Sequence, residues 1–377
     1  MASRRVTVYD VAERAGVSIA TVSFAFRRPS EVRERTREAV YAAARELGYV
    51  PSGSARGLAA GQTGTLGLHA FDLLIDRALE ADAPAASPAS TLDLTESAIP
   101  WERLDEEAVA DPRAFPLYVD EIQRGFELEC RRLGRPVLLS RSSDAVADVT
   151  ETAGRVDGLA VFTSDPSAAA VAALTQVSKA LPVVLFSLPP DADDTHHRIL
   201  VDNRGGMAAL VDHLVAVHGA TGLEFIGGLT AADYGERFAA MREALLAQGL
   251  PAPDAPLDQS PLGRGRALEA LRERIGERRL PRALVCASDQ LALAVMDLLQ
   301  AAGLRVPEDV IVTGFDGVLA GRLSRPTLTT VRQPMEAMGR LAARLLYEET
   351  LAPSPAPRTF RLGTRLYPRA SCGCPET

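Results

Sequence analysis

The 377-residue sequence has no run of about eighteen consecutive apolar residues, the length that a membrane-spanning helix needs. Residues 1–5 lead into a polar pattern and not into the apolar core of a signal peptide. Only four cysteines are present, too few and too scattered for the disulfide framework of a small secreted domain. These absences predict a cytoplasmic protein with no membrane partner.

Two of the four cysteines, Cys372 and Cys374, lie close together in the sequence and flank Gly373. Two thiolates without a neighbouring histidine or a further cysteine do not complete a tetrahedral zinc site. We therefore expect a free tail here, with no metal site and no cofactor.

The motifs of common enzymes are also missing. The sequence has no phosphate-binding G-x-x-x-x-G-K-[ST] loop, no G-x-S-x-G nucleophile elbow and no H-E-x-x-H pair. The adjacent His196 and His197 fall in a polar segment without accompanying ligands. The sequence therefore predicts a protein that is not an enzyme.

The charge is divided unevenly along the chain. The net charge of −8 is unusual for a nucleic-acid binder, but residues 1–61 carry ten arginines against six acidic residues. That segment has a charge of +4, which leaves −12 for the remainder. Only the N-terminal segment therefore suits a partner rich in phosphate.

Three short helices are predicted in this basic segment. Residues 7–15 place apolar side chains on one helical face behind a possible Thr7 cap, and Gly16 supplies a turn. Ser18 can cap a second helix over residues 19–26, and a third amphipathic run covers residues 33–47. Two helices joined by a tight glycine turn are typical of a helix-turn-helix, although a three-helix protein-interaction module has the same pattern.

The segment after the third helix distinguishes these alternatives. Residues 7–67, including the run from Tyr49 to Gly61, closely resemble the headpiece and hinge of the LacI/GalR family of transcription regulators. In that family the second helix enters the DNA major groove, and the hinge inserts a leucine, here Leu58, into the minor groove. A plain linker over residues 50–62 is the alternative. The resemblance implies DNA contacts at Thr7, Val8, Ser18, Ile19, Ala20, Thr21, Ser23, Phe24, Arg27, Ser52, Ala55, Arg56, Leu58 and Ala59.

Several of these positions depart from the family pattern. Ile19 and Ala20 match the pair that sets operator preference, yet neither side chain can form a hydrogen bond with a base. Phe24 stands where an arginine is usual, and Arg27-Arg28 replace a usual Asn-Gly pair. Contacts with thymine methyl groups are what these apolar side chains allow, so the operator sequence does not follow from the resemblance.

From Thr65 onward, short apolar runs alternate with amphipathic stretches. This βαβ alternation predicts parallel sheets covered by helices. We expect strands at 66–70, 137–139, 158–162, 182–186, 223–226, 283–286 and 310–313, and helices at 119–133, 207–217, 234–248, 264–275 and 290–302.

Residues 65–371 resemble the family's type I periplasmic-binding-protein-like core, through runs such as 201–206, 287–290, 313–317 and 326–334. The resemblance implies a headpiece over 1–49, a hinge over 50–62 and a core over 63–377. It divides the core into one lobe of about 63–200 plus 333–362 and a second of about 201–332 plus 363–377. Arg237 and Asp316 match positions that hold effector hydroxyl groups, and cleft-facing matches fall at Phe71, Ser187, Ser288 and Gln333.

One segment, about residues 76–111, has no counterpart in the family pattern. It is rich in alanine and proline and contains Trp101, the only tryptophan. We expect a solvated insertion, although its departure from the first strand would also allow a lid over the cleft mouth.

The fold expected is therefore a small all-α helix-turn-helix domain followed by a two-lobed α/β core. The function expected is a transcription regulator, acting as a repressor, that binds a pseudo-palindromic operator in double-stranded DNA as a homodimer. Its effector is expected to be a carbohydrate or related polyol. A secreted solute-binding protein is the rival interpretation, but it has no use for residues 1–61.

Overall fold

The computed structural model describes residues 7–27, 31–47, 62–71, 117–142, 147–162, 168–190, 195–259 and 268–375. The hinge predicted over residues 50–62, apart from its last residue, and the insertion over residues 76–111, with Trp101, lie outside these ranges. The chain divides into two compact units, residues 1–64 and 65–377.

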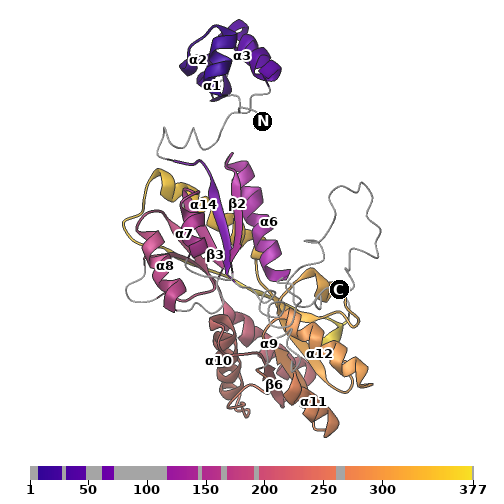
Figure 1. Ribbon diagram of the computed structural model, residues 1–377. Coiled ribbons are helices and arrows are strands. Elements are labelled where there is room, and N and C mark those ends of the chain that lie inside the picture. The colour runs from indigo at the N-terminus through magenta and orange to yellow at the C-terminus, as the bar shows by residue number, and fades with distance from the viewer. Residues whose placement is uncertain are drawn as a thin grey trace. The chain divides into compact units, whose positions relative to one another are not determined.

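The described residues of the first unit form three helices around one small core (Figure 1). The side chains of Val11, Val22, Ala25 and Val40 are fully buried there, one or two from each helix. This burial explains why helices as short as these fold, since tertiary packing of an apolar face stabilises them more than local propensity does. The helices are α1 (Val8–Ala15), α2 (Ile19–Arg27) and α3 (Glu34–Leu47).

The helix ends in this unit agree with the residues that predicted them. The Asp10 carboxylate accepts hydrogen bonds from the Thr7 backbone N–H and hydroxyl, both at 2.7 Å. Gly16 has a left-handed backbone with φ of 66°, which reverses the chain after α1. The Ser18 hydroxyl then accepts a hydrogen bond from the Thr21 backbone N–H at 3.1 Å and caps α2.

The second unit contains two sheets. The first has six strands in the order β10-β5-β4-β3-β1-β2, and every neighbouring pair is parallel. Its strands are β1 (Leu66–Phe71), β2 (Val137–Ser142), β3 (Gly158–Phe162), β4 (Val183–Phe186), β5 (His197–Val201) and β10 (Thr359–Leu362).

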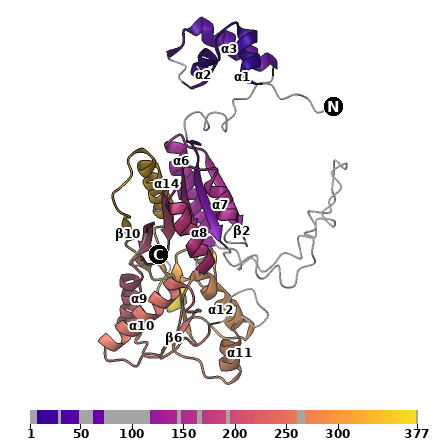
Figure 2. The same cartoon turned by 60° about the vertical axis from the view of Figure 1, so that its left-hand side comes forward.

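Helices cover both faces of this sheet. Ala160 and Phe162 of β3 belong to a core with α6 (Leu117–Arg132) and α14 (Met335–Leu351). Leu159 and Val161, which alternate with them, belong to a core with α7 (Ala147–Ala153) and α8 (Ala168–Ser178). The two pairs of helices lie on opposite sides of the strands in Figure 2. Burial on both faces accounts for the continuous apolar sequences of these strands.

Helices α6 and α14 touch through glycines. A β-carbon added at Gly125 of α6 would overlap the Glu336 backbone carbonyl of α14. A β-carbon at Gly339 of α14 would likewise overlap the Ile122 carbonyl and the Phe126 backbone nitrogen of α6. The absence of side chains at these two positions is therefore what allows the two backbones to approach so closely.

The second sheet has five strands in the order β11-β9-β8-β7-β6, parallel except for β11, which pairs antiparallel with β9. It packs with its helices into one large apolar core. The strands are β6 (Leu223–Ile226), β7 (Ala283–Cys286), β8 (Ile311–Asp316), β9 (Thr329–Arg332) and β11 (Arg365–Tyr367). The helices are α9 (Asn203–His218), α10 (Ala232–Ala247), α11 (Glu269–Gly276), α12 (Asp289–Ala301), α13 (Leu319–Leu323) and the short 3-10 helix η6 (Ala370–Cys372).

The chain passes between the two sheets three times. It leaves β5 for α9 after Val201, leaves β9 for α14 after Arg332, and leaves β10 for β11 after Leu362. Each sheet is thus completed by a segment distant in sequence. Among the described residues, no helix is long and apolar enough to cross a membrane.

All seven predicted strands and all five predicted helices of the core are present. Most of their ends lie one to five residues from the predicted positions. Part of the helix predicted at 264–275 lies outside the described residues, and the observed helix begins at Glu269. The placement of His196 and His197 in a polar loop was wrong for His197, which is buried in β5 with its Nε2 at 3.8 Å from Glu349 Oε2. The sequence patterns did not predict the following described elements: β5, β9, β10, β11, α7, α8, α13, α14 and η6.

Candidate functional site

In the first unit, α2 carries an exposed surface that is unusually apolar. Ile19 and Phe24 each expose about two fifths of their side chains, and Ala20 and Ser18 are exposed beside them. The opposite side of the helix supplies Val22 and Ala25 to the core. The predicted base-reading positions are therefore on the solvent side, where their side chains are available to a partner.

The structure describes the side chains of only some of the other residues predicted to contact DNA. Thr7 is exposed, and Val8 is half-buried against the helical core. Thr21 and Ser23 are half-buried, and the Thr21 hydroxyl lies 2.9 Å from the Ser18 hydroxyl. The Arg27 side chain lies outside the described residues, as do Ser52, Ala55, Arg56, Leu58 and Ala59.

Sequence reasoning did not include Tyr9, which is 67% exposed on α1. An aromatic residue in the first turn of α1, next to the apolar face and not on it, is the signal that could have drawn attention to it. By contrast, the Tyr41 hydroxyl donates to the Ala25 carbonyl at 2.7 Å and joins α3 to α2.

In the second unit, a buried arginine occupies the centre of the candidate effector site. Arg237 of α10 is 2% exposed, and its guanidinium lies 3.8 Å from the centre of the Phe315 ring. Its Nε donates to Asn203 Oδ1 at 2.9 Å and its Nη1 to the Ala287 carbonyl at 2.6 Å. These bonds fix the direction of the guanidinium plane.

Asp316, the last residue of β8, faces this arginine. Its Oδ1 lies 3.5 Å from Arg237 Nη1 and accepts a hydrogen bond from Gln333 Nε2 at 2.7 Å. Gln333 directly follows β9 and is 1% exposed. Asp316 therefore contacts two other predicted effector residues, Arg237 and Gln333. Asp316 and Gln333 lie at the carboxyl ends of the neighbouring parallel strands β8 and β9, where α/β proteins place their ligands.

Two features of this arrangement carry a cost in free energy. Asp316 has φ of 119°, a left-handed backbone that a residue with a β-carbon rarely adopts. Among the described residues, Gln333 Oε1 is buried without a hydrogen-bond partner. An unpaired buried acceptor of this kind could be satisfied by a hydroxyl donor of a bound molecule.

Burial also changes the ionisation of this cluster. Burial raises the pKa of Asp316 to about 7, although the Arg237 guanidinium opposes the rise. The pKa of Asp289, at the start of α12, is raised above its usual range by burial and by the Asp316 charge. Asp289 Oδ2 accepts from the Val318 backbone N–H at 2.8 Å and Oδ1 from the Thr330 hydroxyl, so it supports the loop after β8.

Sequence reasoning missed a second polar layer behind Arg237. Asn203 Nδ2 donates to Asp233 Oδ1 at 2.9 Å and to Glu236 Oε2 at 2.7 Å. Asp233 Oδ2 in turn lies 3.7 Å from Arg237 Nη2. Asn203 was inside a quoted family run, but only its buried position between two helices reveals its role in orienting Arg237.

The remaining predicted effector residues are distributed between two sheets. Ser187 follows β4 with φ of 63°, and its hydroxyl lies 3.0 Å from the Tyr118 hydroxyl of α6. Burial and the Asp233 charge raise the pKa of Tyr118, so a carboxylate of α10 acts on a hydroxyl of α6. For Phe71 the structure gives only the backbone, as the last residue of β1.

Ser288 has a structural role that the sequence comparison did not reveal. Its hydroxyl accepts a hydrogen bond from the Leu291 backbone N–H at 3.3 Å and caps α12. Burial raises the pKa of Tyr234, and a hydrogen bond with Ser288 opposes the rise. Tyr234 lies over Arg237, with 5.6 Å from the guanidinium to the ring centre.

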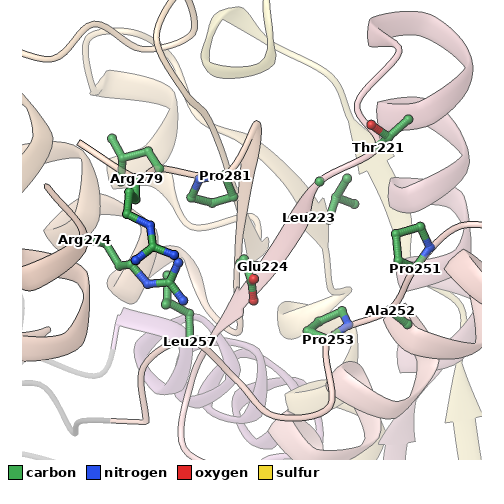
Figure 3. A pocket seen from close by; sticks show the side chains of 12 residues that line it. Thr221, Leu223, Glu224, Pro251, Ala252, Pro253, Leu257, Arg274, Arg279 and Pro281 are labelled. Carbon is green, nitrogen blue, oxygen red and sulfur yellow. The ribbon is translucent and has the colours of Figure 1, made fainter. Parts of the chain in front are cut away.

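A surface pocket of about 470 Å³ lies elsewhere in the second unit (Figure 3). The side chains of Arg274 and Arg279 lie together there and face the region of Glu224. Burial raises the pKa of Glu224, while Arg274 opposes the rise. The pocket borders the amino ends of β6 and β7, opposite to the strand ends that carry Asp316 and Ser288, so it is separate from the candidate effector site.

The expectation of a free cysteine tail without nearby histidines was wrong. Cys372 and Cys374 lie against His213 and His218 of α9, with both cysteine Sγ atoms within 3.6 Å of His213 Nε2. The sequence gave no sign of this contact because more than 150 residues separate the two pairs.

Comparisons with known proteins agree with this geometry. Residues 7–52 match the family of bacterial regulatory proteins of the lacI type, and residues 211–372 match a periplasmic binding protein-like domain. The HTH-type transcriptional repressor PurR of Erwinia tasmaniensis is 28% identical over 371 residues, covering 97% of this chain and 96% of that protein. The PurR of Escherichia coli is 26% identical over the same shares of the two chains.

In both units the chain is similar to the LacI/GalR family of transcription regulators. These relatives are named as transcriptional repressors. A solved structure of the Lac repressor dimer bound to operator and an anti-inducer superposes with a TM-score of 0.73 at 24% identity, over 98% of this chain and 99% of that one. A complex of the regulator CelR with cellobiose gives 0.63 at 26% identity, over 97% of this chain and all of that one.

Proposed function

We propose that this chain is a DNA-binding transcriptional repressor that binds a pseudo-palindromic operator as a two-fold homodimer. A carbohydrate or related polyol, bound at Arg237 and Asp316, controls its affinity for DNA. The observation that carries the effector proposal is the buried contact of Asp316 with Arg237 and Gln333. A carboxylate accepts hydrogen bonds from neighbouring hydroxyl groups while a guanidinium donates to hydroxyl and ring oxygens. The similarity to a regulator solved with cellobiose supports the same ligand class.

The ligand class can be tested by thermal unfolding of the full chain in the presence of single compounds. A compound that binds the folded state at 100 times its dissociation constant stabilises that state by about 2.7 kcal/mol. The panel should hold mono- and disaccharides, polyols, nucleobases and amino acids. Stabilisation by a sugar or polyol, together with a change in operator affinity, is expected. If only compounds without hydroxyl groups stabilise the chain, the carbohydrate proposal is overturned.

The choice of substitution matters for this test. Arg237→Ala removes bonds to Asn203 and Ala287 as well as the ligand contact, so it is expected to destabilise the second unit. Asp316→Asn keeps the shape and removes only the carboxylate charge. Asp309→Asn, at an exposed aspartate paired with Arg305, is the matched control. We expect Asp316→Asn to abolish the effector response and to preserve operator binding, with Asp309→Asn like the wild type.

The hinge is part of the same proposal. If residues 50–62 form a helix on DNA and Leu58 enters the minor groove, movement of the effector lobes can separate paired hinges and weaken operator binding. Leu58→Ala is then expected to lower operator affinity strongly while leaving salt-dependent binding to random DNA nearly unchanged. Equal losses on both DNAs at fixed salt, or no loss on either, would identify the segment as a passive linker.

The dimer follows from the size of the first unit. One headpiece of three short helices offers few contacts, and specific affinity in such proteins requires two half-sites. Sedimentation of the full chain with and without a pseudo-palindromic duplex is the measurement. A monomer with full operator affinity would contradict the proposal.

A further inference from the structure

Four potential metal ligands meet where α9 ends. His213 and His218 come from α9, Cys372 from η6, and Cys374 from the turn that follows. One ligand atom from each residue lies within 4.8 Å of the other three. Cys372 is 1% exposed and the other three side chains are half-buried, so the ligand atoms are largely shielded from water.

Four of the six distances between the ligand atoms agree with those of a zinc tetrahedron, and the other two are at most 4.8 Å. Zinc bonds of about 2.3 Å to sulfur and 2.05 Å to nitrogen place ligand atoms roughly 3.5 Å apart for sulfur and nitrogen and roughly 3.3 Å for two nitrogens. Here the Nε2 atoms of the two histidines are 3.2 Å apart. The sulfur to nitrogen distances are 3.6 Å from Cys372 to His213, 3.5 Å from Cys374 to His213 and 3.5 Å from Cys374 to His218.

We propose that His213, His218, Cys372 and Cys374 form a structural zinc site. Two imidazole nitrogens and two thiolates are a donor set that Zn²⁺ prefers, and the two thiolate charges balance the ion. Four protein ligands fill the tetrahedron, so no coordination position remains for a substrate or a catalytic water.

The local backbone brings the two cysteines to the same side. Gly373 between them has a left-handed backbone with φ of 98°, and its N–H donates to the Ala370 carbonyl at 2.9 Å. The Cys372 thiol donates to the Arg369 carbonyl, with 3.2 Å between Sγ and the oxygen. Metal binding releases this proton, and the ion then ties the segment 369–374 to α9 within the second unit.

The site can be tested on the full chain, reduced and without a polyhistidine tag. Elemental analysis after Zn²⁺ loading is expected to give one zinc per chain. Titration with Co²⁺ is expected to give the visible absorption of tetrahedral cobalt with thiolate ligands. Because loss of outer-shell partners alone costs 10–100-fold in metal affinity, we expect Cys374→Ser and His213→Gln to lower zinc affinity by at least about 100-fold.

Cys286→Ala and His196→Gln are the matched controls, since both residues are buried outside the cluster. They are expected to bind zinc like the wild type. A chelator is expected to lower the melting temperature of the wild type but not that of Cys374→Ser, a readout that separates lost metal from misfolding. Less than one zinc per chain at micromolar free zinc, equal affinity in wild type and Cys374→Ser, or a Cys372–Cys374 disulfide in the reduced chain would overturn the proposal.

Discussion

The contact between α6 and α14 allows a quantitative test, because Gly125 faces backbone atoms of Glu336 and not a movable side chain. Gly125→Ala must push the two helices apart. Overpacking of this kind costs about 1–3 kcal/mol, and contact with backbone places the cost at the upper end. The gain in helix propensity returns about 1 kcal/mol. We therefore expect the free energy of unfolding to fall by about 2 kcal/mol and the melting temperature to fall by roughly 4 °C, measured by circular dichroism.

Gly276→Ala is the matched control, because Gly276 lies at the end of α11 and an added β-carbon meets nothing within 4 Å. This variant is expected to be neutral or slightly more stable. Gly339→Ala should resemble Gly125→Ala, and the double variant should lose less than the sum, since helices already separated accept the second methyl group at lower cost. A neutral or stabilising effect of Gly125→Ala would refute the close-contact interpretation.

Three further predictions concern ionisation and the first unit. Burial raises the pKa of Asp316 to about 7. The stability that this carboxyl contributes is therefore present below about pH 4 and is lost as the pH rises to about 7. Asp316→Asn should remove this dependence on pH from the free energy of unfolding, measured by urea denaturation between about pH 4 and 7. Tyr41→Phe removes the hydrogen bond to the Ala25 carbonyl and should destabilise the first unit by about 1 kcal/mol in thermal unfolding, whereas an unchanged transition would show that the bond has no net effect. Glu46→Gln breaks an ion pair with Arg14 in which both side chains are 55% exposed, so a loss above roughly 1 kcal/mol would contradict its assignment as a weak surface pair.

Sequence reasoning succeeded where the pattern is local. The strands 158–162, 223–226 and 283–286 were predicted to the residue, because runs buried on both faces are short, apolar and bounded by turns. It failed at β10 and β11, whose residues are exposed or half-buried and which pair with strands distant in sequence. The helices α7 and α8 were missed because no clear amphipathic pattern distinguishes them.

The candidate sites follow the same division. Arg237, Asp316 and Gln333 were identified through family matches, and the structure brings them together. Asn203 and Asp233 were not identified, since their importance depends on a contact with Arg237 that no spacing reveals. The pairing of Cys372 with His213 depends on the same kind of long-range contact, as it requires the segment after β11 to reach α9.

The triple passage of the chain between the sheets has a practical consequence for dividing this protein. A fragment that ends before Thr359 lacks β10 and exposes the hydrogen-bonding edge of β5 in the first sheet. It also lacks β11, which covers the edge of β9 in the second. Two uncovered edges in one polypeptide are templates for intermolecular pairing. Neither lobe is therefore a suitable unit for expression by itself, and crystallisation or display of the effector site requires the whole of residues 65–375.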